Sequence, residues 1–318
     1  MPEAVLRATA RISAAEADAG PPFDGRKDLF IEEAPVLFRG ADGEELRGVV
    51  ACPAGENVPM PQTVLVLVHG WGTNRSGPAR LLVRMARRAA LSSVAALYFD
   101  LPGRGESAGE YVSVDIDAMI DATLDAVRYM RERGMQKVLL AGLCSGANIA
   151  LAAGGLAPND IAGVFAMSAL PYQEERSAGL RISRSLHQIK GYVRKAFRLS
   201  TWKRLFRGEI DVKGVAKAVS AEDGRGPGDK NLKQSGRDLP GAVSRYPGMK
   251  QLVWGEKDPE AAGSRAYFEK LFAGTSKPAD IYIVGGANHN YYGLPAQQEV
   301  LTVLDRFIAS TGETRPVE

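Results

Sequence analysis

The stretch "AGLCSGAN", residues 141–148, follows the apolar run "KVLLA" and opens a run of small residues, "GANIALAAGG". A nucleophile on a tight turn between a strand and a helix needs very small residues two positions before and two after it, because the backbones pack closely there. Cys144 has glycine at both positions, whereas Ser145 has leucine and alanine. The spacing therefore predicts Cys144 as the nucleophile. The alternative is a small buried cysteine that only fills the turn.

Short apolar runs alternate with helical patterns after residue 60, which predicts a mostly parallel α/β sheet with helices on both faces. One helical pattern, residues 115–134, has acid at its start, base near its end and glycine as a stop. Two earlier runs, 28–38 and 45–52, flank an Asp-Gly turn and predict an antiparallel hairpin at one edge. The strands expected in the parallel sheet are 63–70, 93–100, 137–143, 161–170, 249–255 and 279–286.

The strand signals stop between residues 171 and 247, where 17 Lys/Arg face 8 Asp/Glu. We expect a basic, helical cap insertion here, an N-terminal extension over 1–27, and a core formed by 28–170 and 248–312. The insertion's positive charge could hold an anionic donor or contact a membrane surface, and it is equally compatible with a solvated helix face. It contains a basic cluster formed by Arg194, Lys195, Lys203 and Arg204.

The composition narrows the class of protein. The chain has 318 residues, 45% of them hydrophobic, and contains no run of about 18 apolar residues that would span a membrane. Its two cysteines suggest neither disulfides nor a zinc site, and a net charge of +3 gives no reason to expect nucleic acid as a partner. We therefore expect a cytoplasmic protein without stable membrane insertion, metal or cofactor, whose partner is a small molecule.

A base for the nucleophile must come from three histidines. His289, in "GGANHNYY", follows the last predicted strand and should lie at the carboxyl edge of the sheet, where Cys144 also lies. We predict that it is the base. His69 precedes "GWG" and His187 falls in the insertion, so both are interpreted as structural or solvated.

An acid should orient the other nitrogen of the imidazole ring. Asp258, in "VWGEKDP", follows the penultimate predicted strand and is the residue predicted for this role. Glu256 is the neighbouring alternative, and Glu174 or Glu175 are more distant ones.

Five motifs occur in order along the chain: "VHGWG", "FDLPGRGES", "GLCSG", "GEKDP" and "GANH". Together they resemble the α/β-hydrolase-fold superfamily over residues 28–310, in which nucleophile, acid and histidine follow one another in this order. The resemblance implies an oxyanion hole formed by the backbone N–H groups of Trp71 and Ser145, and a tight loop braced by Asp100 and Ser107. A cysteine nucleophile is similar to that of dienelactone hydrolases and polyhydroxyalkanoate synthases. "LCSGA" and "TWKRLFRGEIDVKG" are most similar to the α/β hydrolases associated with exosortase and exopolysaccharide loci.

A competing motif, "GRGESA" at residues 103–108, has the glycine spacing of a dinucleotide-binding turn. A phosphate-binding helix would have to begin at these glycines, whereas Gly109 follows where the helix should run. The braced loop explains the stretch better.

A thiolate at a helix N-terminus beside a histidine has a pKa below the usual value of about 8.5. Attack on an acyl carbon would form a thioester on the enzyme, and because a thiolate leaves easily, activated acyl donors such as lactones, enol esters or thioesters are expected. Hydrolysis is the leading hypothesis. Acyl transfer from an acyl-coenzyme A or similar anionic donor to an amine, alcohol or thiol is the second, and a catalytically silent ligand-binding protein is the third.

Overall fold

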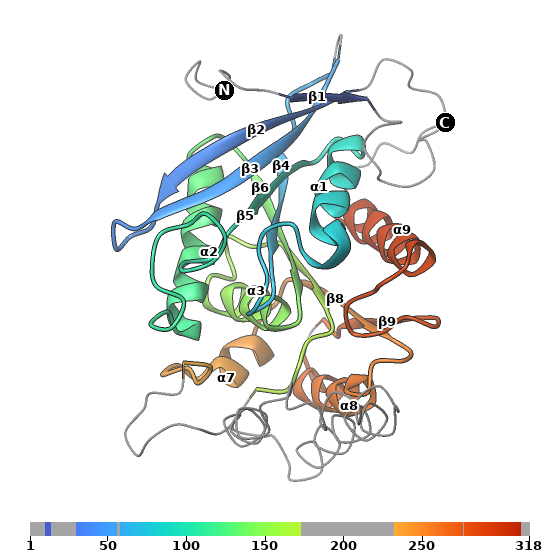
Figure 1. Ribbon diagram of the computed structural model, residues 1–318. Helices are drawn as coiled ribbons and strands as arrows, with labels where there is room; N and C mark the ends of the chain where they lie inside the picture. Colours follow the sequence, from blue (N-terminus) through green and yellow to red (C-terminus); the bar gives the residue numbers. More distant parts are fainter. Residues whose placement is uncertain (1–9, 14–29, 56–57, 173–231, 276, 313–318) are drawn as a thin grey trace, which may run out of the picture. The chain divides into compact units, whose positions relative to one another are not determined.

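The computed structural model describes residues 10–13, 30–55, 58–172, 232–275 and 277–312 (Figure 1). Within these ranges nine strands form one sheet in the order β1-β2-β3-β5-β4-β6-β7-β8-β9. The pairs among β1, β2, β3 and β5 are antiparallel, and all pairs from β5 to β9 are parallel. The strands are β1 (Ala10–Ser13), β2 (Phe30–Arg39), β3 (Glu45–Ala54), β4 (Thr63–Val68), β5 (Ala95–Phe99), β6 (Lys137–Leu143), β7 (Gly163–Met167), β8 (Met249–Gly255) and β9 (Asp280–Val284).

The central parallel strands are buried on both faces, which is why they read as continuous apolar runs. Every residue of β4 is 0% exposed. The six predicted parallel strands and the β2–β3 hairpin are confirmed. One strand was not expected: β1 lies inside the predicted N-terminal extension and pairs outside the hairpin, with Ala10 opposite Glu33.

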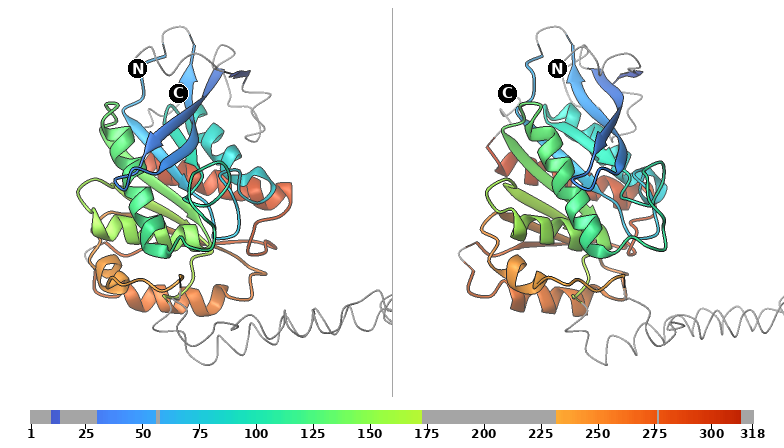
Figure 2. Two further views of the ribbon diagram at one scale, coloured as in Figure 1. Left: turned by 60° about the vertical axis from the view of Figure 1, so that its left-hand side comes forward. Right: turned by 90° about the vertical axis from the view of Figure 1, so that its left-hand side faces the viewer.

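Helices cover both faces of the sheet, as predicted (Figure 2). Two pack on one face with a core that includes Leu65 and Leu67, and four pack on the other with a core that includes Val64 and Val66. The first group is α1 (Leu81–Leu91) and α9 (Leu294–Ser310); the second is α2 (Ile116–Arg131), α3 (Ser145–Leu156), α7 (Leu239–Ser244) and α8 (Ala261–Leu271). Among the described residues, no helix is both long and apolar enough to cross a bilayer.

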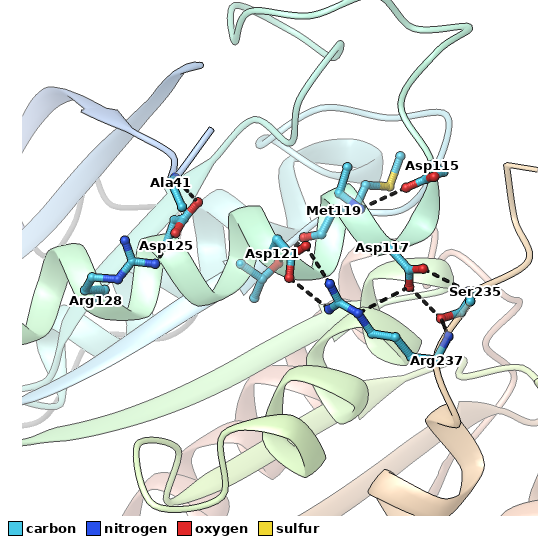
Figure 3. Close-up of polar contacts among 12 residues, drawn as sticks. Ala41, Asp115, Asp117, Met119, Asp121, Asp125, Arg128, Ser235 and Arg237 are labelled. Atoms are coloured by element: carbon cyan, nitrogen blue, oxygen red, sulfur yellow. Dashed lines mark hydrogen bonds and ion pairs between the residues drawn. The ribbon is translucent and has the colours of Figure 1, made fainter. Parts of the chain in front are cut away.

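Helix α2 begins where the Asp115 carboxylate accepts a hydrogen bond from the amide of Ala118 at 3.0 Å. Further along the same helix, acidic side chains bind the chain that returns from the insertion (Figure 3). Asp117 accepts from the Ser235 hydroxyl at 2.5 Å, and Asp121 accepts two hydrogen bonds from Arg237 at 2.7 and 2.8 Å. A bidentate arginine–carboxylate pair fixes orientation as well as distance. The returning chain is thus fastened to α2.

The chain that leaves the core after β7 is fastened as well. Asn148 on α3 exchanges two hydrogen bonds with the backbone of Leu170, at 2.6 and 3.0 Å, and its carbonyl accepts from the Tyr172 hydroxyl at 3.0 Å. These contacts are buried, so each polar atom needs the partner it has.

Most of the predicted insertion lies outside the described residues. This applies to His187, Glu174, Glu175 and the basic cluster Arg194, Lys195, Lys203 and Arg204. Residues 239–244 of the same stretch form α7, which packs against α3. The backbones approach closely there, because a Cβ on Gly155 would lie 2.6 Å from the carbonyl of Ala242.

Candidate active site

Cys144 lies on the turn that joins β6 to α3. Its backbone has φ 58° and ψ −124°, a conformation that costs a non-glycine residue about 1–3 kcal/mol. A Cβ on Gly142 would lie 2.2 Å from the carbonyl oxygen of Gly146, and a Cβ on Gly146 would lie 2.3 Å from that of Val68. No side chain fits at either position. The glycine spacing noted in the sequence therefore corresponds to a strained strand-to-helix turn whose two flanking glycines pack directly against neighbouring backbone.

His289 and Asp258 meet at the carboxyl end of the sheet. His289 follows β9, Asp258 follows β8, and His289 Nδ1 lies 2.8 Å from Asp258 Oδ2. The Asp258 side chain is 1% exposed, and its other oxygen accepts from the amide of Glu260 at 3.0 Å. A buried carboxylate with these donors can hold an imidazole ring in one orientation.

The ionisation of the pair follows from its surroundings. Burial lowers the pKa of His289, but hydrogen bonds to Asp258 and to the Cys144 side chain outweigh this effect and raise the pKa to about 10. Burial raises the pKa of Asp258, yet its hydrogen bond with His289 leaves that pKa below the usual value. At neutral pH Asp258 is therefore ionised and His289 is a protonated imidazolium, which is hydrogen-bonded to the sulfur atom of Cys144.

The amide of Trp71 faces the same turn. Gly70 lies against Cys144, because a Cβ on this glycine would be 3.5 Å from that of the cysteine. The Trp71 N–H donates to the Ser145 hydroxyl oxygen at 2.6 Å. The amide of Ser145 itself belongs to the first residue of α3, where a helix has no internal acceptor for it. Both predicted oxyanion-hole residues thus adjoin Cys144, and the contact of the Ser145 hydroxyl was not foreseen.

Both ring nitrogens of His69 form hydrogen bonds with backbone groups. Nδ1 donates to the carbonyl of Gly70 at 2.8 Å, and Nε2 accepts from the amide of Leu101 at 3.0 Å. The ring is 0% exposed, and burial lowers its pKa to about 4, so it stays neutral. Because the Gly70 carbonyl shares a peptide plane with the Trp71 N–H, His69 orients that amide.

Asp100 and Ser107 hold the glycine-rich loop together. The Ser107 hydroxyl donates to the Asp100 carbonyl at 2.6 Å, and the buried Asp100 carboxylate accepts from the amides of Arg75 and Glu106 at 2.7 and 3.0 Å. Asp100 also forms an ion pair with the Arg75 guanidinium. The next helix, α2, begins only at Ile116, so no helix starts at these glycines to bind a dinucleotide phosphate.

Glu256, the neighbouring alternative to Asp258, makes a different contact. Its carboxylate accepts from the amide of Gly286 at 2.7 Å and is exposed. The structure thus brings Cys144, His289 and Asp258 together and holds Glu256 on the adjoining turn. Among the described residues, no three His, Cys, Asp or Glu side chains are grouped to hold a metal ion.

Two cations beside Trp71 were missed in the sequence. The Arg104 guanidinium lies 4.7 Å from the centre of the Trp71 ring and donates from Nε to the Trp71 carbonyl at 3.2 Å. Lys233 Nζ lies 5.4 Å from the same ring centre, on the chain fastened to α2. Arg104 falls within the motif "FDLPGRGES", but nothing in the local sequence marks either residue as a neighbour of Trp71, because both contacts join segments far apart in the chain.

Comparisons with known proteins agree with this architecture. Residues 65–302 match the model of a family described as "Alpha/beta hydrolase family", and the chain belongs to that family. The predicted α/β-hydrolase fold, with a mostly parallel sheet flanked by helices, is therefore confirmed. No curated protein matches the sequence.

Solved structures share the fold at low sequence identity. Est1E from Butyrivibrio proteoclasticus, solved with ferulic acid bound, is 16% identical, with a TM-score of 0.60 over 86% of this chain and 98% of that one. The Pyrococcus furiosus esterase Pf2001 is also 16% identical, with a TM-score of 0.60 over 88% and 91%. A dienelactone hydrolase from Anabaena variabilis is 14% identical, with a TM-score of 0.58 over 88% and 98%.

Proposed function

We propose that the protein hydrolyses an activated ester, lactone or thioester through Cys144, His289 and Asp258. The observation that carries this proposal is one connected arrangement: a cysteine on a strained turn, hydrogen-bonded to a histidine whose far nitrogen lies 2.8 Å from a buried aspartate. Such a chain of contacts is the signature of an activated nucleophile.

Each residue of the site has its own role in this reaction. The Cys144 thiolate attacks the acyl carbon, and the oxygen that becomes negative accepts hydrogen bonds from the amides of Trp71 and Ser145. The tetrahedral intermediate collapses to a thioester as the bond to the leaving group breaks and His289 gives that group its proton. Water then attacks the thioester while His289 takes a proton from it. The thiolate leaves, and the acid product and the ion pair remain.

The acyl donor should carry a good leaving group, because a thiolate is expelled more readily than an unactivated alkoxide. The similar structures fit this class: two are described as an esterase and a dienelactone hydrolase, and Est1E was solved with ferulic acid.

Acyl transfer is the second candidate, favoured by the cations Arg104 and Lys233 beside Trp71. Positive charge next to the site suits an anionic donor such as an acyl-coenzyme A, and the thioester on Cys144 can be resolved by an amine, alcohol or thiol as well as by water.

Intact-protein mass spectrometry after mixing with p-nitrophenyl acetate, acetyl-coenzyme A or a simple lactone tests both candidates. The wild-type protein and Cys52→Ala should gain one acyl group, whereas Cys144→Ala should gain none. Products formed with and without added amine or thiol then separate hydrolysis from transfer. Acylation and turnover retained in Cys144→Ala would refute the proposal.

A further inference from the structure

The hydrogen bond between Trp71 and Ser145 joins the two residues whose amides the proposed function assigns to the oxyanion hole. The Ser145 hydroxyl oxygen lies 2.6 Å from the Trp71 amide nitrogen, and the serine is half-buried beside Cys144. Donors of an oxyanion hole act at about 2.7–3.1 Å from the oxygen that becomes negative. The Ser145 hydroxyl oxygen therefore lies about where a substrate oxygen would have to lie to accept from the Trp71 amide.

An amide has one hydrogen, so the substrate oxygen and the Ser145 hydroxyl compete for the same donor. The amide cannot turn to serve both, because its peptide plane is held from the other side. The Gly70 carbonyl in that plane accepts from His69 Nδ1 at 2.8 Å and from the Thr73 hydroxyl and amide at 3.1 and 3.2 Å. A serine side chain, in contrast, has three staggered rotamers. The hydroxyl is the group that can move.

We propose that the Ser145 hydroxyl fills the oxyanion hole of the resting protein and is displaced by the substrate acyl oxygen, so that the Ser145 side chain lowers the acylation rate. The proposal rests on the proposed function. A hydrogen bond to a charged acceptor is about twice as strong as one to a neutral acceptor. An oxyanion therefore displaces the hydroxyl readily, whereas the neutral carbonyl of a bound substrate gains little by doing so. The hydroxyl thus adds the cost of about one neutral hydrogen bond to each acylation that uses the Trp71 amide.

The test compares two reactions of the same sulfur atom in Ser145→Ala. Acylation by p-nitrophenyl acetate forms an oxyanion, whereas alkylation by iodoacetamide displaces iodide from a saturated carbon and forms none. Removing the competing hydroxyl should raise the second-order rate constant for acylation about two- to tenfold, the worth of one neutral hydrogen bond, and leave the alkylation rate unchanged. The inhibition constant of a trifluoromethyl ketone, which forms a tetrahedral oxyanion on a thiolate, should fall by a similar factor.

Ser145→Thr keeps the hydroxyl and serves as the matched variant, and its acylation rate should not show the rise expected for Ser145→Ala. Slower acylation in Ser145→Ala would show that the hydroxyl donates to the oxyanion. An unchanged acylation rate would show that the hydroxyl does not compete with the substrate for the Trp71 amide. Either result would overturn the proposal. Equal changes in acylation and alkylation would place its effect on the thiol and overturn it too. Failure of the proposed function is distinguishable, because acyl groups would then be absent from Cys144 in every variant.

Discussion

Asp258→Asn tests the charge that orients His289. The substitution keeps the shape of the side chain and an oxygen able to accept from His289 Nδ1, but it removes a negative charge that is 1% exposed and lies 2.8 Å from the ring. Because the charge is buried, water cannot replace it.

The size of the expected effect on His289 follows from its hydrogen bond to Asp258. Hydrogen bonds to charged groups are worth about 1.5–3 kcal/mol and neutral ones about 0.5–1.5 kcal/mol, so the imidazolium of His289 loses about 1–1.5 kcal/mol of stabilisation. That corresponds to about one pKa unit. The pKa of His289, raised to about 10 in the intact site, should fall accordingly. With partial loss of ring orientation, the acylation rate at neutral pH should drop about 10- to 100-fold, and less than in His289→Ala.

The assay is the acylation rate of Cys144 across pH, measured from the release of p-nitrophenol under single-turnover conditions. The raised pKa of His289 means that the ring is protonated below about pH 10 and loses its proton above it. The alkaline limb of the profile should therefore move to lower pH by about one unit in Asp258→Asn.

Glu256→Gln is the matched control, because it makes the same acid-to-amide change on the adjoining turn, where the carboxylate bonds only to the amide of Gly286 among the contacts described. Its acylation rate should stay within about twofold of wild type, as for an exposed side chain away from the reacting atoms. A crippled Glu256→Gln beside an active Asp258→Asn would refute the assignment of the acid.

Three further outcomes are expected. Iodoacetamide should label Cys144 well before Cys52, since burial and a nearby glutamate raise the pKa of Cys52 to about 11; peptide mapping showing the reverse order would contradict this. Gly146→Ala should lower the free energy of unfolding by at least about 1–3 kcal/mol because its Cβ would lie 2.3 Å from a backbone carbonyl, whereas Gly285→Ala, with open space around it, should change stability little in urea titrations. The pKa of His69 is lowered from 6.5 to about 4, so its contribution to the free energy of unfolding, about 3 kcal/mol, is present above pH 6.5 and is lost as the pH falls towards 4. His69→Gln should therefore make the free energy of unfolding less dependent on pH between 6.5 and 4. The same dependence in both proteins would contradict this role of His69.

The parallel part of the fold was predictable because its strands are buried on both faces. β4, for example, appears as six consecutive apolar or β-branched residues, "TVLVLV". β1 was not predictable: its four residues "ARIS" show no apolar run, and pairing with β2 defines them as a strand. The strand order was not readable either, since β5 lies between β3 and β4 and periodicity carries no information on which strands become neighbours.

Some contacts of the candidate site could be predicted from the sequence and others could not. Residues that follow parallel strands share one edge of the sheet, so Asp258 and His289 could be paired from the sequence alone. The contact of the Ser145 hydroxyl with Trp71 depends on a side-chain rotamer, which a motif does not specify. Lys233 reaches Trp71 from a segment more than 150 residues further along the chain. Contacts of this kind are set by tertiary packing.

The fastening of the chain on both sides of residues 173–231 has a consequence for evolutionary change. Tyr172 is bonded to α3 and Ser235 to α2, so both ends of this segment have fixed attachment points on the sheet-bearing unit. For a segment closed between fixed points, each doubling of its length costs only about 0.6 kcal/mol in closure entropy. Insertions, deletions and wholesale exchange of this segment among relatives should thus leave the sheet and the Cys144 turn almost undisturbed.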